Sequence, residues 1–112
     1  MEDLLCRIKK IEYHQRLLLK MIENQNYPVY ELFVKKDLSE VDAAELFSLC
    51  DELTLKLETQ KEEGFVYFTP LLTEFIRLLN PKLEPKETIN AFLKQNLYRS
   101  LMEELEKSFD CQ

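Results

Sequence analysis

The sequence has little glycine and histidine, and this scarcity excludes several kinds of active site. Among its 112 residues there are one glycine and one histidine, His14. Phosphate-binding loops such as G-x-G-x-x-G and the P-loop need more than one glycine, so neither can be built here. An H-E-x-x-H motif or a two-histidine metal site within one chain is excluded in the same way. We therefore expect no enzyme activity and no cofactor.

Positive charge and long apolar runs are also scarce. Lys and Arg total 15 against 21 Asp and Glu, which gives a net charge of -6 and argues against binding to nucleic-acid phosphates. No apolar run approaches the ~20 residues that a membrane-spanning helix needs. The N-terminus lacks the basic and then apolar order of a signal peptide. We expect a cytoplasmic protein that binds neither nucleic acid nor membranes.

The three cysteines form no recognisable framework. Cys6, Cys50 and Cys111 are odd in number, far apart and without a C-x-x-C pair, so neither a disulfide scaffold nor a zinc knuckle is indicated. A Cys50–His14 nucleophile would need an electropositive setting, whereas Asp51 follows Cys50 directly. The simplest interpretation is three reduced thiols, with Cys50 packed as a small apolar side chain.

What the sequence does contain is helical periodicity. With 46% hydrophobic and 32% charged residues, the chain is suited to one folded domain spanning residues 1–112. Apolar residues recur every three or four positions along most of it. We predict an all-α, multihelical subunit of five to six helices.

The first predicted helix, roughly 2–24, carries a heptad seam. Its seam residues are Leu4, Ile8, Ile11, Gln15, Leu18 and Ile22. One polar residue within an apolar seam can fix the register and number of associating helices. Gln15 therefore suggests a helix that packs against copies of itself, the alternative being that Gln15 faces solvent at a bend. Additional apolar positions in the second half predict contact with more than one neighbour.

Two further helices are predicted in the first half of the chain. Pro28 begins a short helix over 28–36, since proline is tolerated in a first helical turn. Ser39 is positioned as an N-cap for the longest helix, over 40–63, with Asp42 three residues later. The apolar stripe of that helix is Ala43, Leu46, Phe47, Cys50, Leu53 and Leu57.

The only glycine, Gly64, is predicted to end the longest helix in a left-handed conformation. An apolar connector follows, and Thr69 is predicted to cap a helix that Pro70 opens and that runs up to Asn80-Pro81. Leu71, Leu72, Phe75, Leu78 and Leu79 are expected to face inward. We consider the aromatic residues of the connector a possible binding strap, namely Phe65, Tyr67 and Phe68.

The C-terminal third is expected to close the domain with a helix from Pro85 and a break at Gln95-Asn96. A final segment then carries Leu97, Leu101, Leu105 and Phe109. Two short helices or one bent helix would satisfy this pattern.

Two weak site hypotheses remain. The acidic residues Asp51, Glu52 and Glu45 could bind a divalent cation through carboxylate oxygens, although their spacing is not diagnostic. In a trimer, three copies of His14 could surround a symmetry axis, the alternative being a flanking or solvent-facing histidine. We assign neither as a metal site.

Several short motifs, taken together, resemble the YhaI family of small Bacillus proteins. They are Tyr27-Pro28, Cys50-Asp51-Glu52-Leu53, Gln60-Lys61, Gly64-Phe65-Val66, Leu79-Asn80, Lys82-Leu83, Glu87-Thr88-Ile89, Leu97-Tyr98 and Leu101-Met102. The match spans nearly the whole chain. It implies an all-helical subunit of about five helices, intertwined with its copies in a homo-oligomer and most simply a trimer. It implies no activity and no ligand residues.

We therefore expect a small homo-oligomeric module whose exposed grooves bind a protein, either its own copies or another chain. The alternative is a small-ligand or metal-binding protein with a pocket at the subunit interface or beneath the aromatic strap.

Overall fold

The computed structural model describes residues 3–23, 27–65 and 68–110, apart from the side chains of Ile22 and Glu23. Within these ranges the chain forms six helices and no strand, which confirms the predicted all-α fold. They are α1 (Leu4–Glu23), α2 (Pro28–Lys35), α3 (Glu40–Glu62), α4 (Thr69–Leu78), α5 (Pro85–Lys94) and α6 (Arg99–Asp110). None of the helices in the described ranges is long and apolar enough to cross a membrane.

The start of α3 is fixed by the predicted cap. The Ser39 hydroxyl accepts a hydrogen bond from the backbone N–H of Asp42 at 3.1 Å, and the Asp42 carboxylate accepts one from the backbone N–H of Ser39 at 3.2 Å. This reciprocal pair satisfies two donors that the helix itself cannot. The carboxylates of Glu40 and Asp42 also lie at the positive end of the helix dipole.

Three helices end in the same backbone motif. After α3, Gly64 has φ of +88°, and the N–H groups of Gly64 and Phe65 donate to the carbonyls of Lys61 and Gln60. Two donors therefore satisfy carbonyls that the helix leaves open, as in a Schellman cap. The same pair of bonds closes α2, where Asp37 has φ of +58°, and α5, where Asn96 has φ of +60°. The predicted stop at Gly64 and the break at Asn96 are thus confirmed.

Gly64→Ala is expected to lower the free energy of unfolding by about 1 kcal/mol. The reason is backbone strain alone, because a Cβ at Gly64 would meet no other atom within 4 Å, while left-handed φ is unfavourable for alanine. Urea denaturation measures the change. Glu63→Ala, at an exposed position with right-handed helical angles, is the matched control. Equal stability of the Gly64→Ala variant and the wild type would contradict the assignment.

The beginning of α4 differs from the prediction. Thr69 is the first helical residue rather than the cap, and Phe68 occupies the cap position without a side-chain hydrogen bond. The backbone carbonyl of Phe68 already accepts from the N–H of Leu71, so the helix starts one residue earlier than Pro70 suggests. Leu78 was expected to face inward but is 45% exposed, whereas Leu79 is buried.

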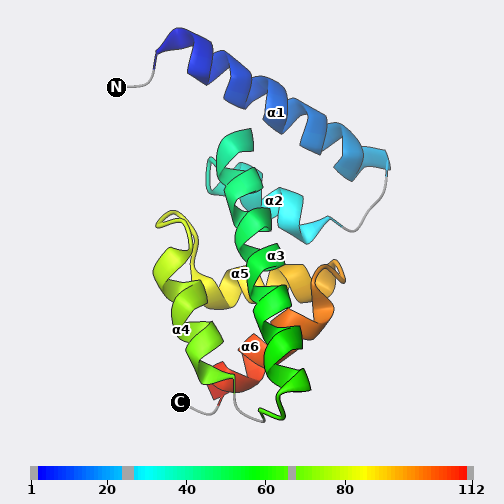
Figure 1. Cartoon of the computed structure of the whole chain (residues 1–112). Coiled ribbons are helices and arrows are strands. Elements are labelled where there is room, and N and C mark those ends of the chain that lie inside the picture. The colour runs from blue at the N-terminus through cyan, green and yellow to red at the C-terminus, as the bar shows by residue number, and fades with distance from the viewer. Residues whose placement is uncertain (1–2, 24–26, 66–67, 111–112) are drawn as a thin grey trace.

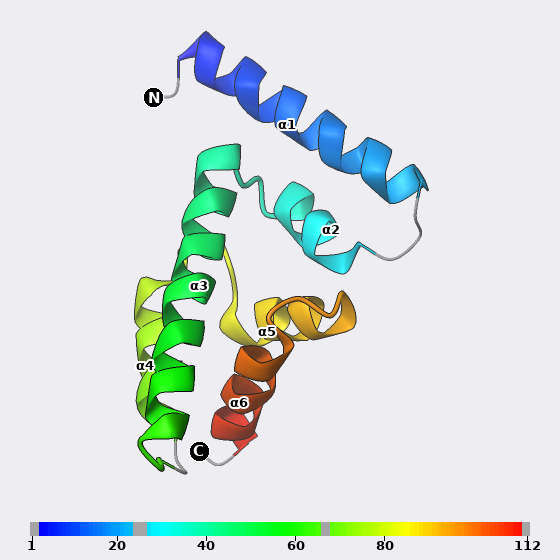
Figure 2. The same ribbon diagram turned by 45° about the vertical axis from the view of Figure 1, so that its right-hand side comes forward.

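The core joins all six helices. α3 packs against α4 and α6, α4 packs against α6, and α5 packs against α6 and α2. Figures 1 and 2 show α3 running along the molecule, with α4 and α6 beside its lower half and α5 between α6 and α2. Phe33 from α2, Phe75 from α4 and Phe92 from α5 are fully buried. The domain is therefore held by contacts between segments far apart in the sequence.

Helix α1 lies at one end of the molecule. It packs on α2 and extends past it, so that its N-terminal part points away from the other helices (Figures 1 and 2). The Cα radius of gyration is 15.3 Å, above the roughly 13 Å of a compact chain of this length. The projecting helix accounts for the elongated shape, with principal extents of 49 × 33 × 24 Å.

Candidate functional site

Helix α1 buries one face and exposes an apolar stripe on another. Tyr13 and Leu17, four residues apart, are buried within the core cluster. The predicted seam residues lie elsewhere on the helix, with Leu4 71%, Ile8 43% and Ile11 57% exposed. Gln15 and Leu18 of the seam are exposed as well, and the Ile22 side chain lies outside the described residues. Leu5 and Leu19 are exposed as well, and we call these two residues together with Leu4, Ile8, Ile11, Gln15 and Leu18 the α1 stripe.

Polar contacts attach the other side of α1 to the turn between α2 and α3. Lys10 Nζ lies 3.2 Å from Asp37 Oδ2, and Arg16 Nη2 lies 2.9 Å from Glu40 Oε2. His14 Nε2 lies 2.6 Å from the backbone carbonyl oxygen of Leu38, to which it donates a hydrogen bond. All three contacts reach residues 37–40. They set the rotation of α1 on the domain, and that rotation turns the α1 stripe outward.

The hydrogen bond of His14 bears on the hypothesis of a metal at a symmetry axis. The side chain is half-buried and directed at the Leu38 carbonyl, toward its own subunit. Because Nε2 carries the donated proton, only Nδ1 could accept a metal. The geometry thus favours the flanking interpretation of His14, as an anchor of α1.

Asp51 accepts a hydrogen bond from a tyrosine, and the acidic residues near it do not form a cation site. The Tyr98 hydroxyl donates to Asp51 Oδ1 at 2.7 Å. Burial, followed by this hydrogen bond and the Asp51 charge, moves the pKa of Tyr98 upward. Across the described ranges, no group of three or more His, Cys, Asp or Glu side chains is arranged to hold a metal ion. Glu45, Glu52 and Asp51 therefore do not converge on a common point.

Cys50 is a core residue. Its side chain is fully buried on α3, and burial together with the charge of Asp51 raises the pKa of its thiol to about 12. A thiol needs a lowered pKa to act as a nucleophile at neutral pH. The environment of Cys50 is the opposite of this, whereas Cys6 on α1 is exposed.

The structure describes two of the three residues of the proposed aromatic strap. Phe68 is buried in the core, Phe65 is 51% exposed, and Tyr67 lies outside the described residues. Phe65 and Phe68 therefore have different environments. The described residues give the strap no common lining surface.

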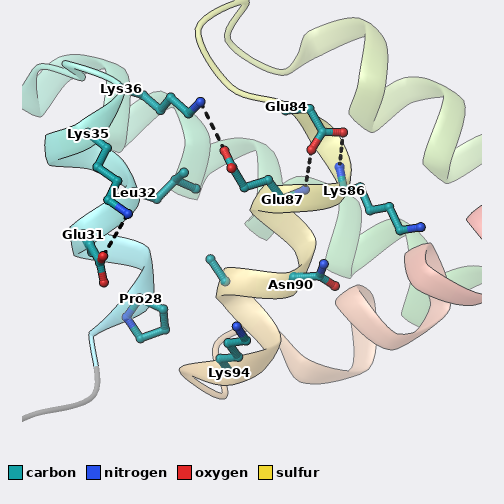
Figure 3. A pocket seen from close by; sticks show the side chains of 11 residues that line it. Pro28, Glu31, Leu32, Lys35, Lys36, Glu84, Lys86, Glu87, Asn90 and Lys94 are labelled. Atoms are coloured by element: carbon teal, nitrogen blue, oxygen red, sulfur yellow. Dashed lines mark hydrogen bonds and ion pairs between the residues drawn. The ribbon is translucent and has the colours of Figure 1, made fainter.

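An open groove of about 540 Å³ lies on the outer surface where α2 and α5 meet (Figure 3). Two of its lysines form ion pairs within the groove: Lys35 pairs with Glu31 at 3.0 Å, and Lys36 pairs with Glu87 at 3.4 Å. The Glu84 carboxylate accepts from two backbone N–H groups and occupies the N-terminus of α5. Because charges of both signs alternate around it, the groove concentrates no charge of one sign, and we assign it no ligand.

The sequence of this chain matches a known protein family. Residues 1–109 match the family model described as Protein of unknown function (DUF1878). The chain belongs to the DUF1878 family. The match covers nearly the whole chain, so all six helices of this DUF1878 protein lie within or reach into the family region. An uncharacterised family, inferred above from scattered short motifs, is confirmed at this level.

The heptad pattern of this DUF1878 chain predicted the stripe but not the way in which α1 docks. Tyr13 and Leu17 bury against the domain, and neither belongs to the predicted seam. The available signal was their i, i+4 spacing, together with the three basic residues Lys10, Arg16 and Lys20 on the same side. Lys20 Nζ lies 5.5 Å from the centre of the Tyr30 ring on α2.

Proposed function

We propose that this protein is a non-enzymatic, cytoplasmic protein-interaction module that assembles with its own copies through the α1 stripe. A trimer is the favoured assembly, with intertwined subunits, as the resemblance to YhaI-like Bacillus proteins implies. The observation that carries the proposal is the exposure of the five seam residues whose side chains the structure describes. When α1 packs on its own subunit, these side chains of the heptad pattern remain exposed to solvent.

The exposed apolar area of α1 favours association. Single exposed apolar side chains are ordinary, but a contiguous stripe along one helix is not, and its burial gains about 25 cal/mol for each Å² removed from water. Leu4, Leu5, Ile8 and Ile11 lie within about two turns of the projecting end of α1, where the subunit's own helices do not cover them. Every copy presents the same stripe, so the stripes of three subunits can pack against one another.

The proposal predicts a wild-type molar mass of three subunits, persisting on dilution, in light scattering on a sizing column. Ile11→Asp places a charge in the middle of the α1 stripe and is expected to lower the mass to that of one subunit. The matched control is Leu55→Asp, which puts the same charge at another exposed leucine, on α3.

Circular dichroism shows whether the Ile11→Asp variant is still folded, and we expect it to retain the helical signal of the wild type. A wild-type monomer at all concentrations would refute self-association. In that case the stripe would be left to a different protein, and a pull-down with Ile11→Asp as the negative bait would follow.

A further inference from the structure

We infer that the α1 helices of neighbouring copies run parallel and in register, with Arg7 of each chain facing Glu12 of the next. This inference rests on the proposed self-association and adds its geometry. It follows from the positions of the few polar residues on or beside the α1 stripe.

Gln15 favours a parallel pair. In the heptad frame, Ile8, Gln15 and Ile22 occupy a positions, and Leu4, Ile11 and Leu18 occupy d positions. A parallel, in-register pair places a against a, so that the Gln15 amides meet and can hydrogen-bond to each other. An antiparallel pair places a against d, and every d residue here is apolar. The buried amide would then lack a partner, which is costly.

The charges beside the seam favour the same orientation. Arg7 is at a g position and Glu12 is at the e position of the following heptad, and both are exposed. In a parallel pair, g of one chain faces the next e of its partner, so Arg7 meets Glu12 with opposite charge. In an antiparallel pair e faces e, and the e residues are Leu5, Glu12 and Leu19. None of these can neutralise Glu12.

Three other cations of α1 are engaged within their own subunit. Lys10 and Arg16 pair with Asp37 and Glu40, and Lys20 lies over the Tyr30 ring. These cations lie on the side of α1 that faces α2 and α3, away from the α1 stripe. The outer face therefore offers an apolar surface with one self-complementary pair of charges, which fits a second α1 better than an anionic surface.

The test is a charge swap read by light scattering over a dilution series. Arg7→Glu should raise the dissociation constant roughly 10-fold or more, since each contact would then bring two carboxylates together. Glu12→Arg should do the same by bringing two guanidinium groups together. The double variant Arg7→Glu, Glu12→Arg should restore the wild-type value, because the pair is reversed but intact.

A cross-linking measurement tests the register separately. In a Cys6→Ser, Cys111→Ser background, Gln15→Cys should form a disulfide between chains on mild oxidation, because identical residues meet at position 15. Lys9→Cys, on the same helix but off the stripe, is the matched control and should stay reduced.

The outcomes separate the two proposals. A monomeric wild type overturns both. If the wild type is oligomeric and Ile11→Asp dissociates it, the parallel pairing alone is overturned in two cases. Either Arg7→Glu leaves the dissociation constant unchanged, or the double variant does not restore the wild-type value. Absence of the Gln15→Cys cross-link in an oligomeric variant has the same meaning.

Discussion

Phe92→Ala is expected to lower the free energy of unfolding by about 3–5 kcal/mol, the range for removal of a fully buried phenylalanine. Phe92 is completely buried on α5, with its ring centre 6.1 Å from Phe47 and 6.2 Å from Tyr98. Phe47 in turn lies 5.9 Å from Phe33 in an edge-on arrangement. Removing Phe92 therefore opens a cavity where helices α2, α3 and α5 meet the start of α6, and aromatic contacts are lost in addition to buried area.

Urea denaturation of Phe92→Ala, with Phe65→Ala as control, measures this effect. Phe65 is half exposed beyond the end of α3, and its removal should change stability by no more than about 0.5 kcal/mol. A loss below about 1 kcal/mol for Phe92→Ala would show that the aromatic cluster does not hold these helices together.

A second large effect is expected at alkaline pH. Burial is the main cause that raises the pKa of Cys50 from 9.0 to about 12 and that of Tyr13 from 10.0 to about 12, with smaller contributions from Asp51 and Glu40. Both groups are neutral when protonated, and the folded state holds their protons more tightly. Their contribution to the free energy of unfolding is therefore fully present below the pKa that each group has in the unfolded chain. It is lost as the pH rises through the pKa that the group has in the folded protein.

For Cys50 alone the loss is about 1.4 kcal/mol per pH unit above about pH 9, or about 2 kcal/mol at pH 10.5. Urea denaturation at four pH values between about 8 and 10.5, under reducing conditions, measures the slope. Cys50→Ala should be less steep, whereas Cys6→Ala should follow the wild type because Cys6 is exposed. Identical slopes in wild type and Cys50→Ala would mean that Cys50 ionises as easily in the folded protein as in the unfolded chain.

The helices were predictable from the sequence where a local signal coincided with periodicity. Ser39 and Asp42 mark the start of α3, and Gly64 marks its end, because caps are made by neighbouring residues. The stripe of α3 was predictable for the same reason, since its buried residues repeat at helical spacing. Thr69 was misassigned because threonine before proline satisfies the rule for a cap, while the backbone of Phe68 had already begun the helix.

The orientation of α1 could not be predicted. Apolar residues occur on more than one side of this helix, so periodicity alone does not show which side packs on the domain. That choice depends on long-range contacts: Tyr13 and Leu17 in the core, and His14 on the Leu38 carbonyl. The sequence pattern identified which residues are apolar, and tertiary packing decided which of them remain exposed.

The caps of α2 and α5 have a consequence for engineering. Asp37 and Asn96 hold left-handed angles that glycine would adopt without the steric cost of a Cβ, which is about 1 kcal/mol or more. The natural chain therefore stores strain at two turns that are closed by backbone hydrogen bonds. Asn96→Gly is therefore expected to raise stability, whereas Asp37→Gly would also remove the carboxylate that pairs with Lys10 on α1.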